Sequence, residues 1–268
     1  MKKPRRTSIG EDIHSGSITA PGDARVAILI PVYKPELSPL EQFSIDYSLS
    51  VIKDRKCFFI APAGLDCSYY SNRYPRVEFE FFPREYFDSI DSYSRLLLAP
   101  FFYDRFLSFE FVLILQPDAI LIRDDLDFWI GQPFDYIGAP WPDGVELTVW
   151  RDRFRDDLRR RVRATVGNGG LSLRRVRKCL ALIHEFPETR TVFMESGTNE
   201  DSYFSLLGAL SIDFIIPNEI IASRFSMELR PEYFHAVNGG YYPMGVHAWW
   251  TVQPRFWAPC IPPLAAVL

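Results

Sequence analysis

The stretch RVAILIPVY, residues 25–33, decides the class of fold. It is a continuous apolar run rich in β-branched residues, which is typical of a strand buried on both faces of a sheet. KCFFIAP (56–62) and VEFEFF (77–82) predict two further strands, and the segments 38–53 and 92–106 predict helices between and after them. This alternation predicts an α/β fold, in which a mixed but mostly parallel sheet is flanked by helices.

The most strand-like segment of the chain is FEFVLILQPDAILI, residues 109–122. In open parallel sheets, ligands bind beyond the carboxyl ends of the strands. The residues that follow the predicted strands are therefore candidates for binding, and Asp118 is one of them. A carboxylate at such a place either caps a turn or holds a divalent cation that bridges the phosphates of a nucleotide.

The segment WRDRFRDDLRRRVR, residues 150–163, places Trp150, Phe154, Leu158 and Val162 four apart and predicts an amphipathic helix. Its other faces carry seven Arg and three Asp. Two interpretations stay open. The segment is either a solvated helix with internal ion pairs, or a surface that contacts an anionic lipid headgroup or a lipid-linked acceptor as a peripheral membrane contact.

A Gly-rich loop lies ahead of the next predicted helix, which spans residues 174–186. In this loop, Asn168, Gly169 and Gly170 allow unusual backbone angles, which suit either a plain turn or the close approach of a ligand. DFIIP, residues 213–217, predicts a short strand later in the chain.

Two further motifs carry titratable groups. Glu200 and Asp201 begin a predicted helix at 199–210, where a carboxylate either faces the helix dipole or acts as a general base. His247 lies in the segment GVHAWW, and it is either structural or a ligand for a transition metal.

Composition bounds the class of protein. The chain has 268 residues, of which 47% are apolar and 24% charged, and this excludes disordered, collagen-like and coiled-coil proteins. A net charge of −4 gives no basic footprint for nucleic acid. The basic and then polar residues 1–24 predict a disordered tail, and residues 25–268 predict a single folded domain.

Cysteine usage and the absence of apolar segments bear on location. The four cysteines match no metal-binding spacing and are expected to be reduced, as in the cytoplasm. The basic start is followed by polar residues rather than an apolar core, and no apolar run approaches the ~18 residues of a membrane span. We therefore expect a cytoplasmic protein, which the Arg-rich segment would bring to the inner face of the plasma membrane.

Aromatic residues make up 15% of the chain. Many are expected in the core, but Tyr33, Trp141, Trp249 and Trp250 lie after predicted strands or in irregular segments, next to proline or glycine. These loop aromatics are predicted to converge on one cleft, because the flat faces of aromatic rings suit the apolar faces of sugars.

The order of these motifs along the chain resembles that in glycosyltransferases of the GT-A fold, whose sheet is Rossmann-like. YSRLLLAPFFYDRF followed by FVLILQPDAIL looks like the helix and strand that lead into their DxD metal motif. VGNGGLSLRR looks like their NGGxSLR element, NEDSYFS like the ED segment of inverting members, and GVHAWW like their late His segment. The resemblance covers residues 25–250, and the motifs together also resemble an uncharacterised bacterial family that occurs with surface-polysaccharide synthesis genes.

The resemblance implies transfer of a sugar from a nucleoside diphosphate donor, a UDP-sugar foremost, to a hydroxyl of a glycan or lipid-linked glycan acceptor. Residues 25–122 would bind the nucleotide and residues 123–268 the acceptor. Asp201 would be the base of an inverting reaction, with Glu200 as the second choice. The residues implied for the donor are Pro31, Val32, Tyr33, Arg95, Gln116 and Asp118; those for the sugar and acceptor pocket are Trp141, Asn168, Gly169, Gly170 and Trp249; and those for Mn²⁺ or Mg²⁺ are Asp118 and His247.

One position departs from the family pattern, because Gln116 stands where the first Asp of the DxD motif is expected. An amide removes one negative charge from the metal site, although it still forms hydrogen bonds. Two other functions stay open. A metal-dependent phosphoester hydrolase would need Asp118, Asp201 and His247 around the same metal, and a non-catalytic glycan-binding domain would not respond to nucleotides.

Overall fold

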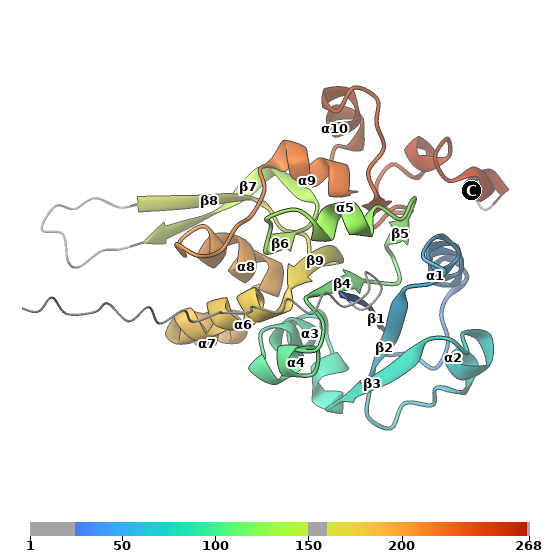
Figure 1. Cartoon of the computed structure of the whole chain (residues 1–268), viewed down its shortest axis with the longest axis horizontal. Coiled ribbons are helices and arrows are strands. Elements are labelled where there is room, and N and C mark those ends of the chain that lie inside the picture. Colours follow the sequence, from blue (N-terminus) through green and yellow to red (C-terminus); the bar gives the residue numbers. More distant parts are fainter. Residues whose placement is uncertain (1–24, 150–159, 267–268) are drawn as a thin grey trace, which may run out of the picture.

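The computed structural model describes residues 25–149 and 160–266 (Figure 1). In this part of the chain, six strands form the central sheet: β1 (Val26–Pro31), β2 (Lys56–Pro62), β3 (Glu78–Phe82), β4 (Phe111–Leu115), β6 (Tyr136–Ile137) and β9 (Leu171–Arg175). Their order is β3-β2-β1-β4-β9-β6. The strands from β3 to β4 are parallel to their neighbours, whereas β9 is antiparallel to both β4 and β6. The predicted mixed, mostly parallel sheet is confirmed.

Two smaller sheets extend this core. One contains three short strands: β5 (Ile120–Leu121), β10 (Ser226–Met227) and β11 (Gly245–Val246). The other is an antiparallel hairpin of β7 (Pro140–Val149) and β8 (Arg160–Val166). Figure 1 shows this hairpin reaching away from the body of the molecule.

The described helices are α1 (Pro39–Val51), α2 (Ser68–Arg73), α3 (Ile90–Leu97), α4 (Pro100–Asp104), α5 (Leu126–Ile130), α6 (Val176–Glu185), α7 (Pro187–Ser196), α8 (Glu200–Gly208), α9 (Glu219–Phe225) and α10 (Pro231–Val237), with short 3₁₀ helices η2 (Arg84–Phe87), η3 (Pro254–Trp257) and η4 (Pro262–Ala266). The predicted helices at 38–53, 174–186 and 199–210 are confirmed as α1, α6 and α8. The segment 92–106 is broken into α3 and α4, because Pro100 has no N–H to continue the first helix.

Helices cover both faces of the central sheet. On one face, Ile28 and Ile30 of β1 pack in a core with Ile45 of α1, Tyr70 of α2 and Phe225 of α9. On the other face, alternate residues of the same strands pack against α3, α4, α6 and α8, which lie to the left of the sheet in Figure 1. Because β1 is buried on both faces, it reads as a continuous apolar run in the sequence.

Three predicted elements need correction. Residues 160–163, expected in a helix, belong to β8, while residues 150–159 lie outside the described residues. The segment 109–122 is two strands, because a turn in which the Ala119 N–H donates to the Gln116 carbonyl separates β4 from β5. Residues 213–217 form no strand in the described structure. The Asp135 N–H donates to the Ile215 carbonyl, the Ile215 N–H donates to Asp135 Oδ2, and Lys178 Nζ donates to the Asp213 carbonyl.

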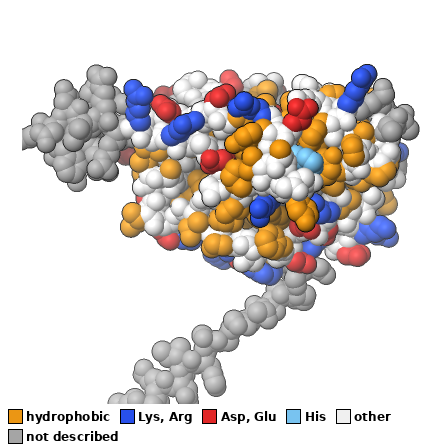
Figure 2. Space-filling model, turned by 90° about the horizontal axis from the view of Figure 1, so that it is seen from above, with side chains coloured by type: hydrophobic (Ala, Val, Ile, Leu, Met, Phe, Trp, Pro, Cys, Tyr) orange, Lys and Arg blue, Asp and Glu red, His pale blue; other side chains and the backbone are white. Residues whose placement is uncertain are grey.

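Figure 2 shows the molecule from above, the side on which α9 and α10 lie in Figure 1. Hydrophobic side chains gather over the middle of this face, with basic side chains toward its edges. In and after α10, Tyr233, Val237 and Tyr241 are exposed. Exposed apolar side chains are common on soluble domains and do not by themselves identify a partner. Within the described ranges, no helix combines the length and the apolar character needed to cross a membrane.

Candidate active site

A cleft of about 760 Å³ lies at the carboxyl ends of β1 and β4. Strand ends of this kind are where open α/β sheets bind their ligands. Most of the site residues predicted from the sequence line it: Pro31, Tyr33, Gln116, Asp118, Trp141, Asn168, Gly169, Gly170, Glu200, Asp201 and His247. The fold therefore brings together motifs that are up to about 200 residues apart in the sequence, as parallel strand topology allows.

Three predicted site residues do not line the cleft. Val32 is buried in the core beneath it, and Arg95 lies on α3 away from the lining. Trp249 is fully buried, and its Nε1–H donates to Ser44 Oγ at 2.7 Å. Its neighbour Trp250 lines the cleft instead, so three of the four predicted loop aromatics converge there.

A three-stranded sheet builds one wall of the cleft. Because β10 and β11 are parallel with Met227 opposite Val246, the next residues, Glu228 and His247, emerge side by side. The pairing of β11 with β5 brings the turn that carries Asp118 to the same place. His247 Nε2 lies 3.2 Å from Asp118 Oδ1, and its Nδ1 lies 3.3 Å from Glu228 Oε2. Glu228 was missed in the sequence, because two-residue strands leave no periodic signal.

The imidazole of His247 sits between two carboxylates in a tight space. Although burial opposes the charged form, Asp118 and Glu228 raise the pKa of His247 to about 10. Both ring nitrogens are buried, and neither has a hydrogen bond of good geometry to any described residue. A Cβ on Gly170 would lie 2.1 Å from Nε2, so glycine is required for the Gly-rich loop to pack against this ring.

Asp118 and His247 are suited to share a cation when the proton of the His247 imidazolium is displaced, because metal ions bind the neutral ring. Oxygen and imidazole nitrogen are ordinary ligands, and two donors bound to one ion stand about 3 Å apart, close to the separation seen here. Glu228 lies on the other ring nitrogen, where a carboxylate typically orients a metal-binding His. In the described part of the chain, no three His, Cys, Asp or Glu side chains form a ready-made ligand set.

Asp201 occupies the start of α8, facing the Gly-rich loop. Its Oδ2 accepts a hydrogen bond from the Gly169 N–H at 3.1 Å, and its Oδ1 accepts one from the Ser202 N–H at 2.6 Å. Burial, and then the negative charge of Glu200, raise the pKa of Asp201 to about 6, while these hydrogen bonds and Arg174 oppose the rise. A carboxylate whose pKa is near 6 accepts a proton more readily than an ordinary Asp.

Glu200 is held differently from its neighbour. It is 5% exposed, and its two carboxylate oxygens accept hydrogen bonds from Arg174 Nη2 at 2.8 Å and from Ser94 Oγ at 3.1 Å. Both oxygens of Glu200 are thus engaged by buried side chains, whereas Asp201 lies against the Gly-rich loop. Of the two candidate bases, the geometry therefore favours Asp201.

The cleft has an acidic lining. Among the described residues that line it, there is no Lys or Arg, and the carboxylates are Glu41, Asp88, Asp118, Glu200, Asp201 and Glu228. The lining also includes Asp88, Ser89 and Tyr93 at and just before the start of α3, for which the sequence predicted no site role.

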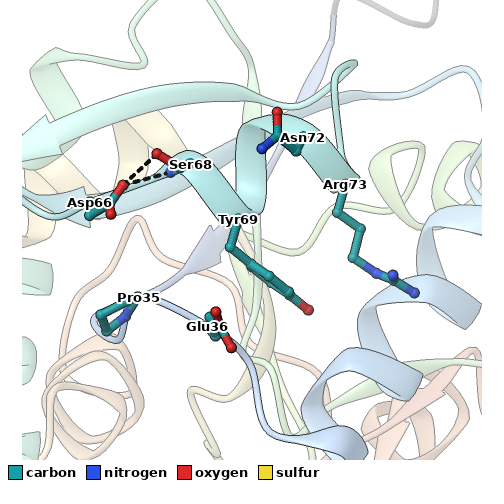
Figure 3. Close-up of a pocket in the computed structure, with 7 residues that line it drawn as sticks. All are labelled: Pro35, Glu36, Asp66, Ser68, Tyr69, Asn72 and Arg73. Carbon is teal, nitrogen blue, oxygen red and sulfur yellow. Dashed lines mark hydrogen bonds between the residues drawn. The ribbon is translucent and has the colours of Figure 1, made fainter.

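A second depression, of about 520 Å³, lies between the loop after β1 and helix α2 (Figure 3). Tyr69 and Arg73 extend from α2 on the same side, and Pro35 and Glu36 lie across from them. Asp66 accepts hydrogen bonds from the N–H and the hydroxyl of Ser68 at 3.0 and 2.6 Å. None of the predicted site residues lines this depression, whereas most of them line the larger cleft.

Solved structures share the fold. Galactosyltransferase LgtC in complex with donor and acceptor sugar analogues is 16% identical, with a TM-score of 0.53 over 90% of this chain and 96% of that chain. An active-site mutant of LgtC is 14% identical over the same shares, again with a TM-score of 0.53. At these identities, the likeness establishes a GT-A-like glycosyltransferase fold and nothing finer.

Comparison with curated protein sequences finds no match. A family model described as "Protein of unknown function (DUF5672)" matches residues 76–247, which include the Gly-rich loop, Asp201 and both candidate metal ligands. Since this match covers more than half of the chain, the protein belongs to the DUF5672 family.

Proposed function

We propose that the protein is a glycosyltransferase that moves a sugar from a nucleoside diphosphate donor, a UDP-sugar foremost, to a hydroxyl of a glycan or lipid-linked glycan. The observation that carries this proposal is a cleft in which a possible cation site and a possible general base lie on different walls. Asp118 and His247 lie 3.2 Å apart on one wall, and Asp201, a carboxylate with a raised pKa, lies on the wall formed by α8. Transfer needs a diphosphate site and a base in this separated arrangement.

The acidic lining supports a bound cation. A diphosphate would enter a cleft with several carboxylates and no Lys or Arg among its described lining residues, so its charge needs another partner. We propose that Asp118 and His247 would hold Mn²⁺ or Mg²⁺. When bound, the cation would stabilise the negative charge that develops on the departing diphosphate.

The proposed reaction is a single displacement. The bond between the anomeric carbon and the diphosphate oxygen breaks as the acceptor oxygen bonds to that carbon, and the acceptor proton passes to Asp201. A base on the face opposite the leaving group gives inversion. Tyr33, at the end of β1, would stack on the nucleobase, and Trp141 and Trp250 would pack against sugar rings.

The alternatives are less well supported. In the described residues, Asp201 joins no ligand cluster with Asp118 and His247, as a metal-dependent phosphoester hydrolase would require. A role in bacterial surface-polysaccharide synthesis at the inner face of the plasma membrane stays a prediction of the resemblance.

Calorimetric titration with UDP tests both the nucleotide and the metal. We expect UDP to bind in the presence of Mn²⁺ and to bind at least about tenfold more weakly in its absence or in the Asp118→Ala variant, since loss of one ligand typically removes several kcal/mol of cation binding. Asp104→Ala, the same change at an exposed residue outside the cleft lining, is the matched control and should bind like wild type. Silence toward UDP and other nucleoside diphosphates would instead favour a glycan-binding domain.

The lining also predicts which donor sugars are rejected. A uronate carried into a cleft with Asp88, Asp201 and Glu228 meets like charges, which cost several kcal/mol when desolvated. We expect UDP-glucuronate to bind at least about tenfold more weakly than UDP-glucose in the presence of Mn²⁺, and the gap to narrow at high salt. Equal affinities in a competition titration would contradict this prediction.

A further inference from the structure

Arg174 lies beneath the floor of the cleft, completely buried. It belongs to β9, and its guanidinium carbon is 5.3 Å from the centre of the Tyr136 ring and 5.4 Å from that of Phe204. A charge in such surroundings carries a large desolvation cost, so proteins retain it only where it is fully paired. The question is what this buried arginine does.

The guanidinium is paired in three directions. Nη2 donates to Glu200 Oε1 at 2.8 Å, Nε donates to Ser172 Oγ at 3.0 Å, and Nη1 is 3.3 Å from the Tyr103 hydroxyl. The second oxygen of Glu200 accepts from Ser94 Oγ at 3.1 Å. Arg174 thereby ties β9 to α8, and through Glu200 to α3, all directly under the cleft.

Two routes lead from Arg174 to Asp201. The first runs through Ser172, whose hydroxyl donates to the Gly169 carbonyl at 3.0 Å, while the Gly169 N–H donates to Asp201 Oδ2 at 3.1 Å. The second runs through Glu200, the residue that precedes Asp201 on α8. Gly169 has no room for a side chain between them, because a Cβ there would lie 2.4 Å from Glu200 Oε1.

We propose that Arg174 is a positioning residue that aims the Asp201 carboxylate into the cleft through Ser172–Gly169 and Glu200, and that its positive charge offsets the negative charge of Glu200 beside Asp201. This inference rests on the proposed role of Asp201 as the base. Arg174 touches no reacting atom in the proposal; its effect passes through the two hydrogen-bonded routes.

Electrostatics support the geometry. The negative charge of Glu200 raises the pKa of Asp201, and the positive charge of Arg174 lowers it. Burial raises the pKa of Tyr103 and of Tyr136, so both phenols stay neutral near neutral pH. Among Arg174, Glu200 and these two tyrosines, Arg174 is therefore the group with a positive charge. The titratable groups that act on Asp201 from β9, α8 and β6 are Arg174, Glu200 and Tyr136. The other titratable groups that line the same cleft are Tyr33, Glu41, Asp88, Tyr93, Asp118, Glu228 and His247.

The test is the titration of Asp201 followed by the ¹³C signal of its carboxyl group, assigned by its loss in Asp201→Asn. We expect Glu200→Gln to lower the pKa of Asp201 and Arg174→Gln to raise it, each by about one, since one charge is removed at short range. An arginine with a merely structural role would not give pKa changes of opposite sign in these two variants. Changes below about 0.3 in both variants, or changes of the same sign, would overturn the proposal.

Arg174→Lys keeps the experiment decisive if Arg174→Gln does not fold. Lysine retains the charge but lacks the planar fork that reaches Ser172 and Glu200 together. We expect the pKa of Asp201 to stay within about 0.3 of wild type, while turnover falls about tenfold with unchanged affinity for UDP. Wild-type turnover in this variant would overturn the positioning role. The titration needs no substrate, so its failure is distinguishable from a failure of the glycosyltransferase proposal.

Discussion

Replacing Asp201 by Asn is expected to lower sugar transfer by about 10²–10⁴-fold and, in the same variant, to stabilise the folded protein at pH 7.5 by about 1–3 kcal/mol. The loss of transfer follows because the amide cannot take the acceptor proton. The gain in stability follows because a buried carboxylate beside Glu200 is costly when ionised. Removal of that charge outweighs the one hydrogen bond, from the Gly169 or the Ser202 N–H, that is lost because the NH₂ group of Asn cannot accept. Product formation and urea unfolding measure the two effects.

The sign of the pH dependence follows from the direction of the shift. The pKa of Asp201 is about 6 in the folded chain and close to 3.8 when unfolded, so the folded state binds the proton more tightly. The resulting stabilisation of wild type is present below pH 4 and is lost as the pH rises through about 6. The stability advantage of Asp201→Asn should therefore be small at pH 4 and complete at pH 7.5.

A control separates this effect from a general change of surface charge. Asp104→Asn makes the same chemical change at an exposed residue at the end of α4, and both transfer and stability should stay near wild type. If the stability difference between Asp201→Asn and wild type were the same at pH 4 and pH 7.5, the raised pKa of Asp201 would be wrong. If it retained near wild-type transfer, its assignment as the base would be wrong.

Much of the fold could be predicted because local sequence patterns indicate the strands and helices of the parallel half of the sheet. Strands such as β1 are buried on both faces and form uninterrupted apolar runs, and α1 begins with a capping box in which Ser38 and Glu41 satisfy each other's backbone N–H groups. In this half, β1 and β2, and β2 and β3, are consecutive strands in the sequence that pair with each other. Apolar runs and periodicity were therefore enough to predict them.

The hairpin of β7 and β8 was missed because its sequence contains both helical spacing and strand-like alternation of apolar residues. Apolar residues four apart begin at Trp150 and favour a helix, but in β8 the buried Ala164 and Val166 alternate with polar side chains, which is a strand pattern. Pairing with β7 decides the outcome, with Val162 opposite Leu147. Such long-range pairing cannot be read from a single local window.

The site residues that belong to sequence motifs were predicted. Those whose position depends on how distant strands pair in the fold were missed. Glu228 has no sequence signal of its own, and it reaches His247 only because two short parallel strands end together. Trp249 and Trp250 look equivalent in sequence, but Ala248 has a φ of +49°, which changes the course of the backbone just before them. As a result Trp249 enters the core and Trp250 enters the cleft.

Arg174→Met is expected to have the largest effect on stability, lowering the free energy of unfolding by about 3–5 kcal/mol at pH 7.5. The reason is the partner left behind, because Glu200 would keep a buried negative charge next to Asp201 without its cation. Arg105→Met removes an exposed ion pair with Glu80 and should cost less than about 1 kcal/mol, which makes it the matched control.

A double-mutant cycle decides whether the pair or the packing is responsible. If the cost comes from an unpaired charge, Arg174→Met combined with Glu200→Leu should recover most of the stability, since replacing both partners of a buried ion pair by apolar groups is often neutral. Additive losses would assign the cost to packing of the Arg174 stem between Tyr136 and Phe204. Recovery of stability without recovery of transfer would mean that the ion pair is retained in the fold for the geometry of Asp201 rather than for stability.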